Sequence, residues 1–257
     1  MPVRGRCGRG IAPGFTTARG HPREIALPAL IPGSVEWHQT PVSGRRAAEG
    51  EIVTIDWDEK KALLQEPNIA QVTQLCDELM EKKPGSTVPY IDPVHDEDEC
   101  RIVTLQVSPG KGTESGFVSH NNDDEAARRA TQIYELAELD PRYVMPWNAY
   151  PWVRDTGSPS ALSVQEKTDG LRPFRQFLKI NSRVSAIIAH GTDASTFLTL
   201  YEKTYHAALK NNGIKIYKAT ALGGRAFAVS DTKQEEILTK NVEIYKDAMQ
   251  RAGIQHL

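Results

Sequence analysis

The sequence predicts an α/β fold, a three-layer α/β/α sandwich with a short, mainly parallel four-stranded sheet. Four short apolar runs have the composition of strands that are buried on both faces, as parallel strands are: "CRIVTLQV", "RYVMPWN", "VSAIIAH" and "GIKIYKA". Segments with helical periodicity separate these runs. Strand and helix therefore alternate, and right-handed crossovers then place helices on both faces of the sheet.

In the sequence, two of the predicted helices precede the first strand and one follows it. From Asp56 the pattern predicts a short helix and then a longer one to Lys83, because Pro67 interrupts it. The next helix, "DDEAARRATQIYELAEL", has acidic residues in its first turn, and we expect Asn122 to cap it.

Three further helices follow the second, third and fourth strands. Gly170 and Pro173 make the pattern of "SVQEKTDGLRPFRQFLKI" less regular. The segment "TDASTFLTLYEKTYHAALK" predicts one uninterrupted helix that stops at "NNG". The segment "DTKQEEILTKNVEIYKDAMQRAG" predicts the last helix, which ends at Gly253.

Composition and charge divide the chain near residue 50. Residues 51–257 have the size of one α/β domain. Residues 1–50 contain no lysine, many Gly and Pro, and seven Arg against three Glu, which is typical of a disordered segment. The net charge of −2 splits into +4 for residues 1–50 and −6 for the rest. We interpret residues 1–50 as a disordered or non-native extension, or as a basic arm that contacts phosphates.

The cysteines and the hydropathy exclude several classes of protein. The three cysteines are far apart, so we expect no structural zinc site and no iron–sulfur cluster. An odd number of cysteines without a disulfide framework favours a cytoplasmic location. No apolar run approaches the ~20 residues of a membrane helix, and the N-terminus lacks the layout of a secretory signal.

Ligands of parallel α/β sheets bind at the carboxyl ends of the strands, so the residues that follow the strands are the candidates for function. After the first strand, "PGKGT" suggests a nucleotide-phosphate loop. Lys111 precedes the second glycine, however, and no glycine stands at the upstream position that a phosphate-binding loop requires. A nucleotide hydrolase or transferase is therefore the weaker alternative.

Four stretches at strand ends together resemble the uracil-DNA glycosylase superfamily: "LQVSPG", "SGFVSHNNDD", "WNAYPW" and "IIAHGTDA". The resemblance covers roughly residues 85–252. It implies a monomeric DNA-repair hydrolase, which takes a damaged base out of DNA into a pocket and cleaves its N-glycosidic bond. DNA that contains uracil or another damaged base would be its partner, and no membrane would be involved. The resemblance also implies that no metal and no cofactor are required.

The resemblance also implies roles for individual residues. Phe117 would stack on the extruded base, Asn148 would read its edge through the side-chain amide, and Ser108 would orient the attacking water. The other residues implied to contact the base are Val107, Pro109, Gly110 and Thr220. From the residues alone, Phe117 can equally be core packing, and Asn148 can cap a turn.

The loop after the fourth strand would face DNA. In this reading, Leu222 enters the gap left by the base, Gly223 and Gly224 let the backbone approach a phosphate, and Arg225 lies beside it. The alternative is a plain strand-to-helix connection whose glycines allow the chain to turn.

The departures from the family pattern concern catalysis. Neither Val107 nor Ser108 is acidic, although members of the family usually carry a carboxylate or an amide at one of these positions. The last motif, "KATALGGRAF", has no histidine, so His120 and His190 remain as candidates. The nearest carboxylates in the sequence are Glu114, Asp123 and Asp155. A protein that binds a modified base or nucleotide without hydrolysing it is therefore the alternative function.

Overall fold

The computed structural model describes residues 45–46, 52–53, 55–110, 115–154 and 161–255. By its internal contacts the chain divides into residues 1–41 and residues 42–257, and the described residues all belong to the second unit. The extension predicted at residues 1–50 lies outside the described residues except for β1 (Arg45–Arg46), which pairs antiparallel with β2 (Ile52–Val53).

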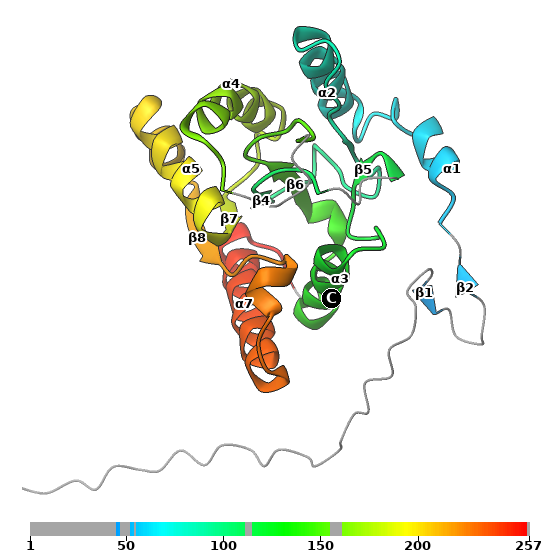
Figure 1. The fold of residues 1–257 in the computed structure, drawn as a ribbon, viewed down its shortest axis with the longest axis vertical. Helices are drawn as coiled ribbons and strands as arrows, with labels where there is room; N and C mark the ends of the chain where they lie inside the picture. The colour runs from blue at the N-terminus through cyan, green and yellow to red at the C-terminus, as the bar shows by residue number, and fades with distance from the viewer. Residues whose placement is uncertain (1–44, 47–51, 54, 111–114, 155–160, 256–257) are drawn as a thin grey trace, which may run out of the picture. The chain divides into compact units, whose positions relative to one another are not determined.

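The centre of the described unit is a four-stranded sheet in the order β6-β4-β7-β8, in which every pairing is parallel (Figure 1). Its strands are β4 (Ile102–Gln106), β6 (Val144–Asn148), β7 (Ala186–His190) and β8 (Lys215–Ala219). Strands β4, β6 and β7 are buried along almost their whole length. The four strands predicted from the apolar runs are thus confirmed, as is their parallel arrangement.

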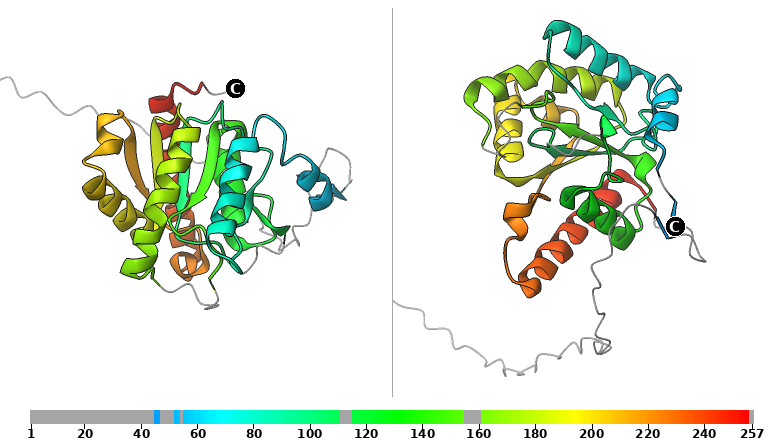
Figure 2. Two further views of the ribbon diagram at one scale, coloured as in Figure 1. Left: turned by 90° about the horizontal axis from the view of Figure 1, so that it is seen from above. Right: turned by 45° about the vertical axis from the view of Figure 1, so that its right-hand side comes forward.

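Helices cover both faces of this sheet, as Figure 2 shows from two further directions. One apolar cluster joins one face of the sheet to α2 (Ala70–Lys82), α4 (Val164–Ile180) and α5 (Gly191–Thr204). A second cluster joins the other face to α3 (Glu125–Ala137) and α7 (Asp231–Ala252). Successive side chains of a strand point to opposite faces, which is why neighbours in one strand belong to different clusters.

The cap of α3 differs from the prediction. The Asp124 side chain accepts hydrogen bonds from the backbone N–H groups of Ala126 and Ala127, so Asp124, not Asn122, is the N-cap. The Asn122 side chain instead accepts from the Ser115 hydroxyl and donates to the Phe117 carbonyl, which closes the loop before the helix. Both residue types cap helices well, and the longer-range contacts of Asn122 decide between them.

The prediction of one helix over residues 192–210 was wrong. Helix α5 ends at Thr204, and a separate turn, α6 (Ala208–Asn211), follows. Two non-glycine residues between them, His206 and Ala207, have φ angles of 52° and 58°, a conformation that breaks a right-handed helix. The interior proline does not break α4, which begins at a capping box of Ser163 and Glu166.

Several short elements escaped the sequence analysis. Strands β3 (Tyr90–Ile91) and β5 (Phe117–Val118) form a separate two-stranded parallel sheet. The 3₁₀ turns η2 (Pro141–Tyr143) and η3 (Gly224–Phe227) were also not predicted. The short helix α1 (Trp57–Ala62) was predicted. Two-residue strands have no periodicity to detect. Within the described part of the chain, no helix combines the length and the apolar character needed to cross a bilayer.

Candidate functional site

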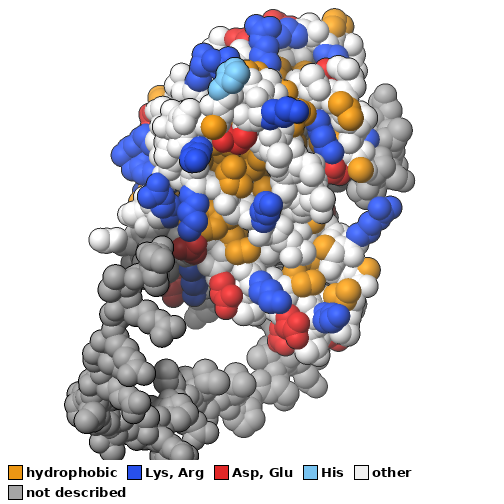
Figure 3. Space-filling model, turned by 90° about the vertical axis from the view of Figure 1, so that its left-hand side faces the viewer, with side chains coloured by type: hydrophobic (Ala, Val, Ile, Leu, Met, Phe, Trp, Pro, Cys, Tyr) orange, Lys and Arg blue, Asp and Glu red, His pale blue; other side chains and the backbone are white. Residues whose placement is uncertain are grey.

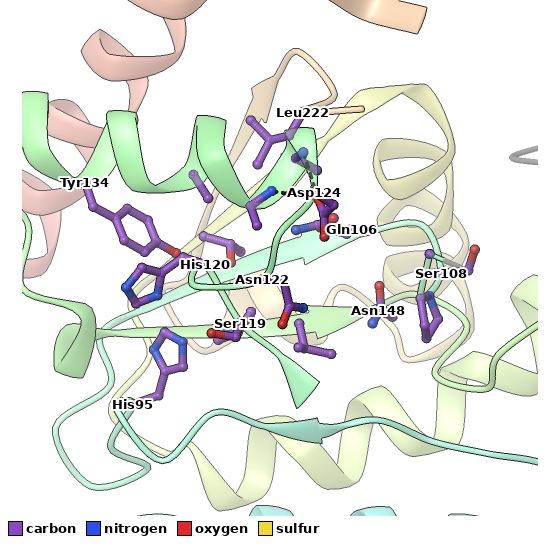
Figure 4. A pocket seen from close by; sticks show the side chains of 18 of the residues that line it. His95, Gln106, Ser108, Ser119, His120, Asn122, Asp124, Tyr134, Asn148 and Leu222 are labelled. Atoms are coloured by element: carbon purple, nitrogen blue, oxygen red, sulfur yellow. Dashed lines mark hydrogen bonds between the residues drawn. The ribbon is translucent and has the colours of Figure 1, made fainter. Parts of the chain in front are cut away.

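A pocket lies at the carboxyl ends of β4 and β6, on the side of the sheet that α3 covers (Figure 4). Its volume, measured as the space open to the centre of a water molecule, is about 70 Å³. The strands and the loop after β4 contribute Thr104, Gln106, Ser108, Pro109, Gly110, Pro146 and Asn148. The other lining residues are His95, Val118, Ser119, His120, Asn122, Asp124, Ala126, Ala127, Ala130, Tyr134, Leu222 and Tyr245.

Five residues that the sequence predicted for the site meet in this pocket: Ser108, Pro109, Gly110, Asn148 and Leu222. Three of the four stretches that carried the resemblance supply lining residues. Parallel pairing brings them together, because β4 and β6 are neighbours whose chains leave the sheet at the same edge.

Other predicted base contacts lie elsewhere. Val107 points to the opposite face of the sheet and packs against the cluster under α2, α4 and α5. Phe117 is fully buried and stacks on Trp57, with ring centroids 5.6 Å apart, so the structure gives it the packing role. Thr220 holds the scaffold with its backbone, which hydrogen-bonds to the side chains of His190 and Asn241.

The loop predicted to face DNA has two parts. Leu222 is only 3% exposed, packs in the cluster under α3 and α7, and accepts a hydrogen bond from Arg129 at 2.7 Å. In this conformation it forms a wall of the pocket and does not protrude. Gly223, Gly224 and Arg225 are exposed and are not among the described lining residues.

Two neighbouring amides dominate the outer wall. Gln106 and Asn148 are register partners in β4 and β6, and both line the pocket. Asn148 is 6% exposed, yet neither amide side chain hydrogen-bonds to any residue in the described ranges. Sequence analysis missed Gln106 because it lies inside the predicted strand, and only the pairing with β6 reveals its position.

Asp124 supplies the single carboxylate among the described residues that line the pocket. Its Oδ1 atom accepts the two capping hydrogen bonds at 2.8 and 2.9 Å, whereas Oδ2 hydrogen-bonds to no described residue. Of the carboxylates singled out in the sequence, Asp123 is exposed, and Glu114 and Asp155 lie outside the described residues. The sequence does contain a signal for Asp124, because it is an acidic residue two positions before the first alanine of an amphipathic helix, where an N-cap is expected. The sequence analysis placed the cap at Asn122 and therefore missed Asp124.

The inner end of the pocket is aromatic and polar. The ring of His120 lies 5.8 Å from that of His95 and 5.3 Å from that of Tyr134. Burial lowers the pKa of His95, so this ring is neutral, and its Nδ1 donates to the Pro141 carbonyl at 2.9 Å. Its Nε2 is then an acceptor. Burial raises the pKa of Tyr134, which keeps this hydroxyl protonated.

A buried ion pair contacts one of the residues that line the pocket. Asp92 is fully buried and accepts hydrogen bonds from the Lys60 ammonium group, at 2.7 Å, and from the Ser119 hydroxyl. Burial alone would raise the pKa of Asp92, but these two partners and the charge of Lys60 lower it below its usual value. Ser119 lines the pocket, so the ion pair fixes the orientation of its hydroxyl.

His190 is a structural residue. It does not appear among the described lining residues, and both of its ring nitrogens are engaged, Nδ1 with the Thr220 carbonyl at 3.0 Å and Nε2 with the Tyr245 hydroxyl at 2.8 Å. Burial lowers the pKa of His190 to about 4, so the ring is neutral at pH 7. Tyr245, which hydrogen-bonds to His190, itself lines the pocket.

A second, positively charged depression lies away from the pocket. Figure 3 shows Lys and Arg side chains spread over one face of the molecule, with fewer acidic ones between them. A shallow depression is lined by Arg172, Arg175, Gln176, Lys179 and Tyr205. These residues lie in the second half of α4 and just after α5. Helix α4 follows β6 and helix α5 follows β7, so both helices begin at the carboxyl ends of the strands and run back towards the other end of the sheet. The depression is therefore near the opposite end of the sheet from the pocket.

No protein-family model matches the chain, and a comparison with curated proteins finds no match to its sequence. Among the described residues, no group of three or more His, Cys, Asp or Glu side chains is arranged to hold a metal ion. The site is thus defined by the pocket itself, whose polar groups are amides, hydroxyls, histidines and one carboxylate.

Proposed function

We propose that this protein is a DNA N-glycosylase of the uracil-DNA glycosylase type, which accommodates an extruded base in the pocket at the ends of β4 and β6. One observation carries the proposal. Ser108, Pro109, Gly110 and Asn148, drawn from two separate stretches of the resemblance, line one pocket at the edge of the sheet where α/β proteins bind ligands. The Asn148 amide has no partner among the described residues and is available to a base.

The pocket has groups suited to hydrolysis. The bond between C1′ of the sugar and the base nitrogen breaks, and the base leaves with the bonding electron pair. The oxygen of a water molecule bonds to C1′, and a proton from that water ends on the base. Ser108 would orient the water, and Asn148 would hold the departing base. Asp124 would offset the positive charge that grows on the sugar, as the carboxylate absent from positions 107 and 108 would otherwise do.

A second candidate function is binding of a modified base without hydrolysis. It is favoured by the lack of a carboxylate at Val107 and Ser108 and by the commitment of one Asp124 oxygen to the helix cap. Such a protein would retain lesion DNA tightly and leave its backbone intact after alkali treatment.

The experiment that tests the proposal uses oligonucleotides with uracil, hypoxanthine, xanthine or a G·T mismatch, in single- and double-stranded form. Each is incubated with excess protein, treated with alkali, and scored for cleavage and for gel shift. We expect cleavage of at least one substrate, and a loss of roughly tenfold to 100-fold in Asn148→Asp, because a carboxylate cannot donate to the base. The matched control is Asn212→Asp, at an exposed position.

Each outcome decides between the functions. Cleavage that depends on Asn148 supports the glycosylase. Binding without cleavage supports the second candidate, and cleavage unchanged by Asn148→Asp contradicts the assigned site. Magnesium-dependent binding of a nucleotide that Lys111→Ala abolishes would instead favour the nucleotide hydrolase or transferase.

A further inference from the structure

We infer that Gln106 reads the base together with Asn148 and makes the pocket selective for bases with an imide edge, an oxo group on each side of a ring N–H. This inference rests on the proposed function and adds to it a specificity-determining residue outside the predicted set. It is carried by the placement of the two side chains and by the absence of side-chain hydrogen bonds between them and any described residue.

The strand register places the two amides side by side. Gln106 and Asn148 are paired Cα partners at the ends of β4 and β6, and neighbouring strands lie about 4.8 Å apart. Both side chains line the same pocket, as Figure 4 shows, and therefore point to the same face of the sheet. The glutamine is one methylene longer, so its amide reaches further into the pocket.

Unpartnered amides are an exception in this protein. The other buried asparagines of the described chain, Asn122, Asn181 and Asn241, all hydrogen-bond through their side chains. Asn148 is buried to a similar degree and makes no such bond with a described residue. Its neighbour Gln106 is partly buried and likewise makes no side-chain hydrogen bond with a described residue. No amide atom of Gln106 or Asn148 is among the fully buried side-chain atoms without a partner in the described chain, so water or a ligand in the pocket can reach both amides. A ligand that pairs with both takes the place of that water.

The hydrogen-bonding pattern of the two amides selects the ligand. A carboxamide offers one acceptor oxygen and one donor NH₂ group. In the amide orientation that turns Gln106 Nε2 towards Asn148 Oδ1, the two side chains offer a ligand a row of donor, acceptor and donor. An imide edge presents the complementary row of oxo, N–H and oxo, as in uracil and xanthine. Hypoxanthine has one oxo group beside its ring N–H and a C–H on the other side, which leaves Gln106 without a partner.

Xanthine and hypoxanthine are a matched pair of substrates for the test, because they differ by this one oxo group. Duplexes that carry either base, or uracil, are assayed for binding and for cleavage. We expect the wild type to prefer xanthine over hypoxanthine by roughly tenfold or more, because hypoxanthine leaves a polar group of the site unpaired. Gln106→Leu, similar in size, should lose this preference and weaken on uracil while its action on hypoxanthine stays the same.

Two further variants make the result specific. Gln106→Glu keeps the shape of the side chain but replaces the donor by an acceptor. Its binding and cleavage of DNA with imide bases should therefore fall at least as strongly as those of Gln106→Leu. Gln250→Leu changes an exposed glutamine of α7 and should behave as wild type. Thermal melting of all variants confirms that the protein is folded, and either Gln106 variant alone suffices for the comparison.

The outcomes separate the two proposals. If the wild type binds and cleaves none of the bases, the proposed function fails, and the inference fails with it. If the wild type acts on these bases but a folded Gln106 variant keeps the same ratio of xanthine to hypoxanthine, the role of Gln106 alone is overturned. An equal loss on both purines also overturns it, because this would indicate a structural role.

Discussion

At the scale of single residues, the proposed function gives Asp124 two purposes. Asp124 caps α3 with Oδ1 and presents its other oxygen to the pocket. The cap requires only a hydrogen-bond acceptor, whereas stabilisation of a cationic sugar requires negative charge. These two requirements can be separated by one substitution, because asparagine caps helices as well as aspartate does.

Asp124→Asn is therefore expected to keep stability and base binding while lowering the cleavage rate by on the order of 100-fold. Single-turnover cleavage of the preferred oligonucleotide measures the rate, and urea denaturation measures the free energy of unfolding. Asp123→Asn, at the exposed neighbouring position, is the control and should leave both unchanged. A full cleavage rate in Asp124→Asn would exclude this carboxylate from catalysis.

At the scale of elements, the site depends on the close approach of α4 to the end of β6. A Cβ atom built on Gly170 would lie 1.8 Å from the carbonyl oxygen of Ala149 and 3.2 Å from the Phe197 ring. Ala149 directly follows the proposed base reader, Asn148. A glycine that looked like a weakness of the helix in the sequence is thus the residue that lets the helix pack against the backbone of the site.

Gly170→Ala is expected to lower the free energy of unfolding by about 1–3 kcal/mol, because the helix or the strand end must move. It should also weaken base binding, since Asn148 moves with Ala149. Chemical denaturation and gel shift test the two effects. For the denaturation measurement, Gly223→Ala is the matched control, because Gly223 has a φ of −72° and no atom lies within 4 Å of its Cβ position. Equal stability of the two variants would contradict this packing argument.

At the scale of the whole molecule, a buried network joins three elements behind the pocket. His190 at the end of β7 contacts the chain after β8 through the Thr220 carbonyl and α7 through the Tyr245 hydroxyl. The ring is neutral in the folded protein, since burial lowers its pKa from 6.5 to about 4. In the unfolded chain it takes up a proton near pH 6.5, so the unfolded state binds more protons below this pH.

The contribution of His190 to the stability of the protein is therefore expected to be constant above about pH 6.5 and to fall as the pH is lowered towards 4. His190 contributes up to about 1.4 kcal/mol for each pH unit in this window. The lowered pKa of His95 acts in the same direction. Urea denaturation at several pH values should show a smaller slope in His190→Asn than in the wild type. Ile188→Val, a buried change in the same strand, should lower stability without changing the slope.

The sequence by itself determined the main elements of this protein. Four strands and the major helices were predicted because burial on two faces and helical periodicity are local properties of the chain. It also determined part of the site, since Ser108, Pro109, Gly110 and Asn148 follow or end strands whose carboxyl ends share one edge. The predicted identity of the pocket, a base-binding site, remains a prediction.

Only the tertiary structure decided which side chains share the pocket. Gln106 enters it through the register with β6, and Asp124 through the position of the α3 cap, whereas Phe117 is withdrawn by its stack on Trp57. The break after α5 and the two-residue strands β3 and β5 also depend on distant contacts. The physical reason is the same in each case: pairing, burial and stacking join segments far apart in the chain, and no local pattern records the partner.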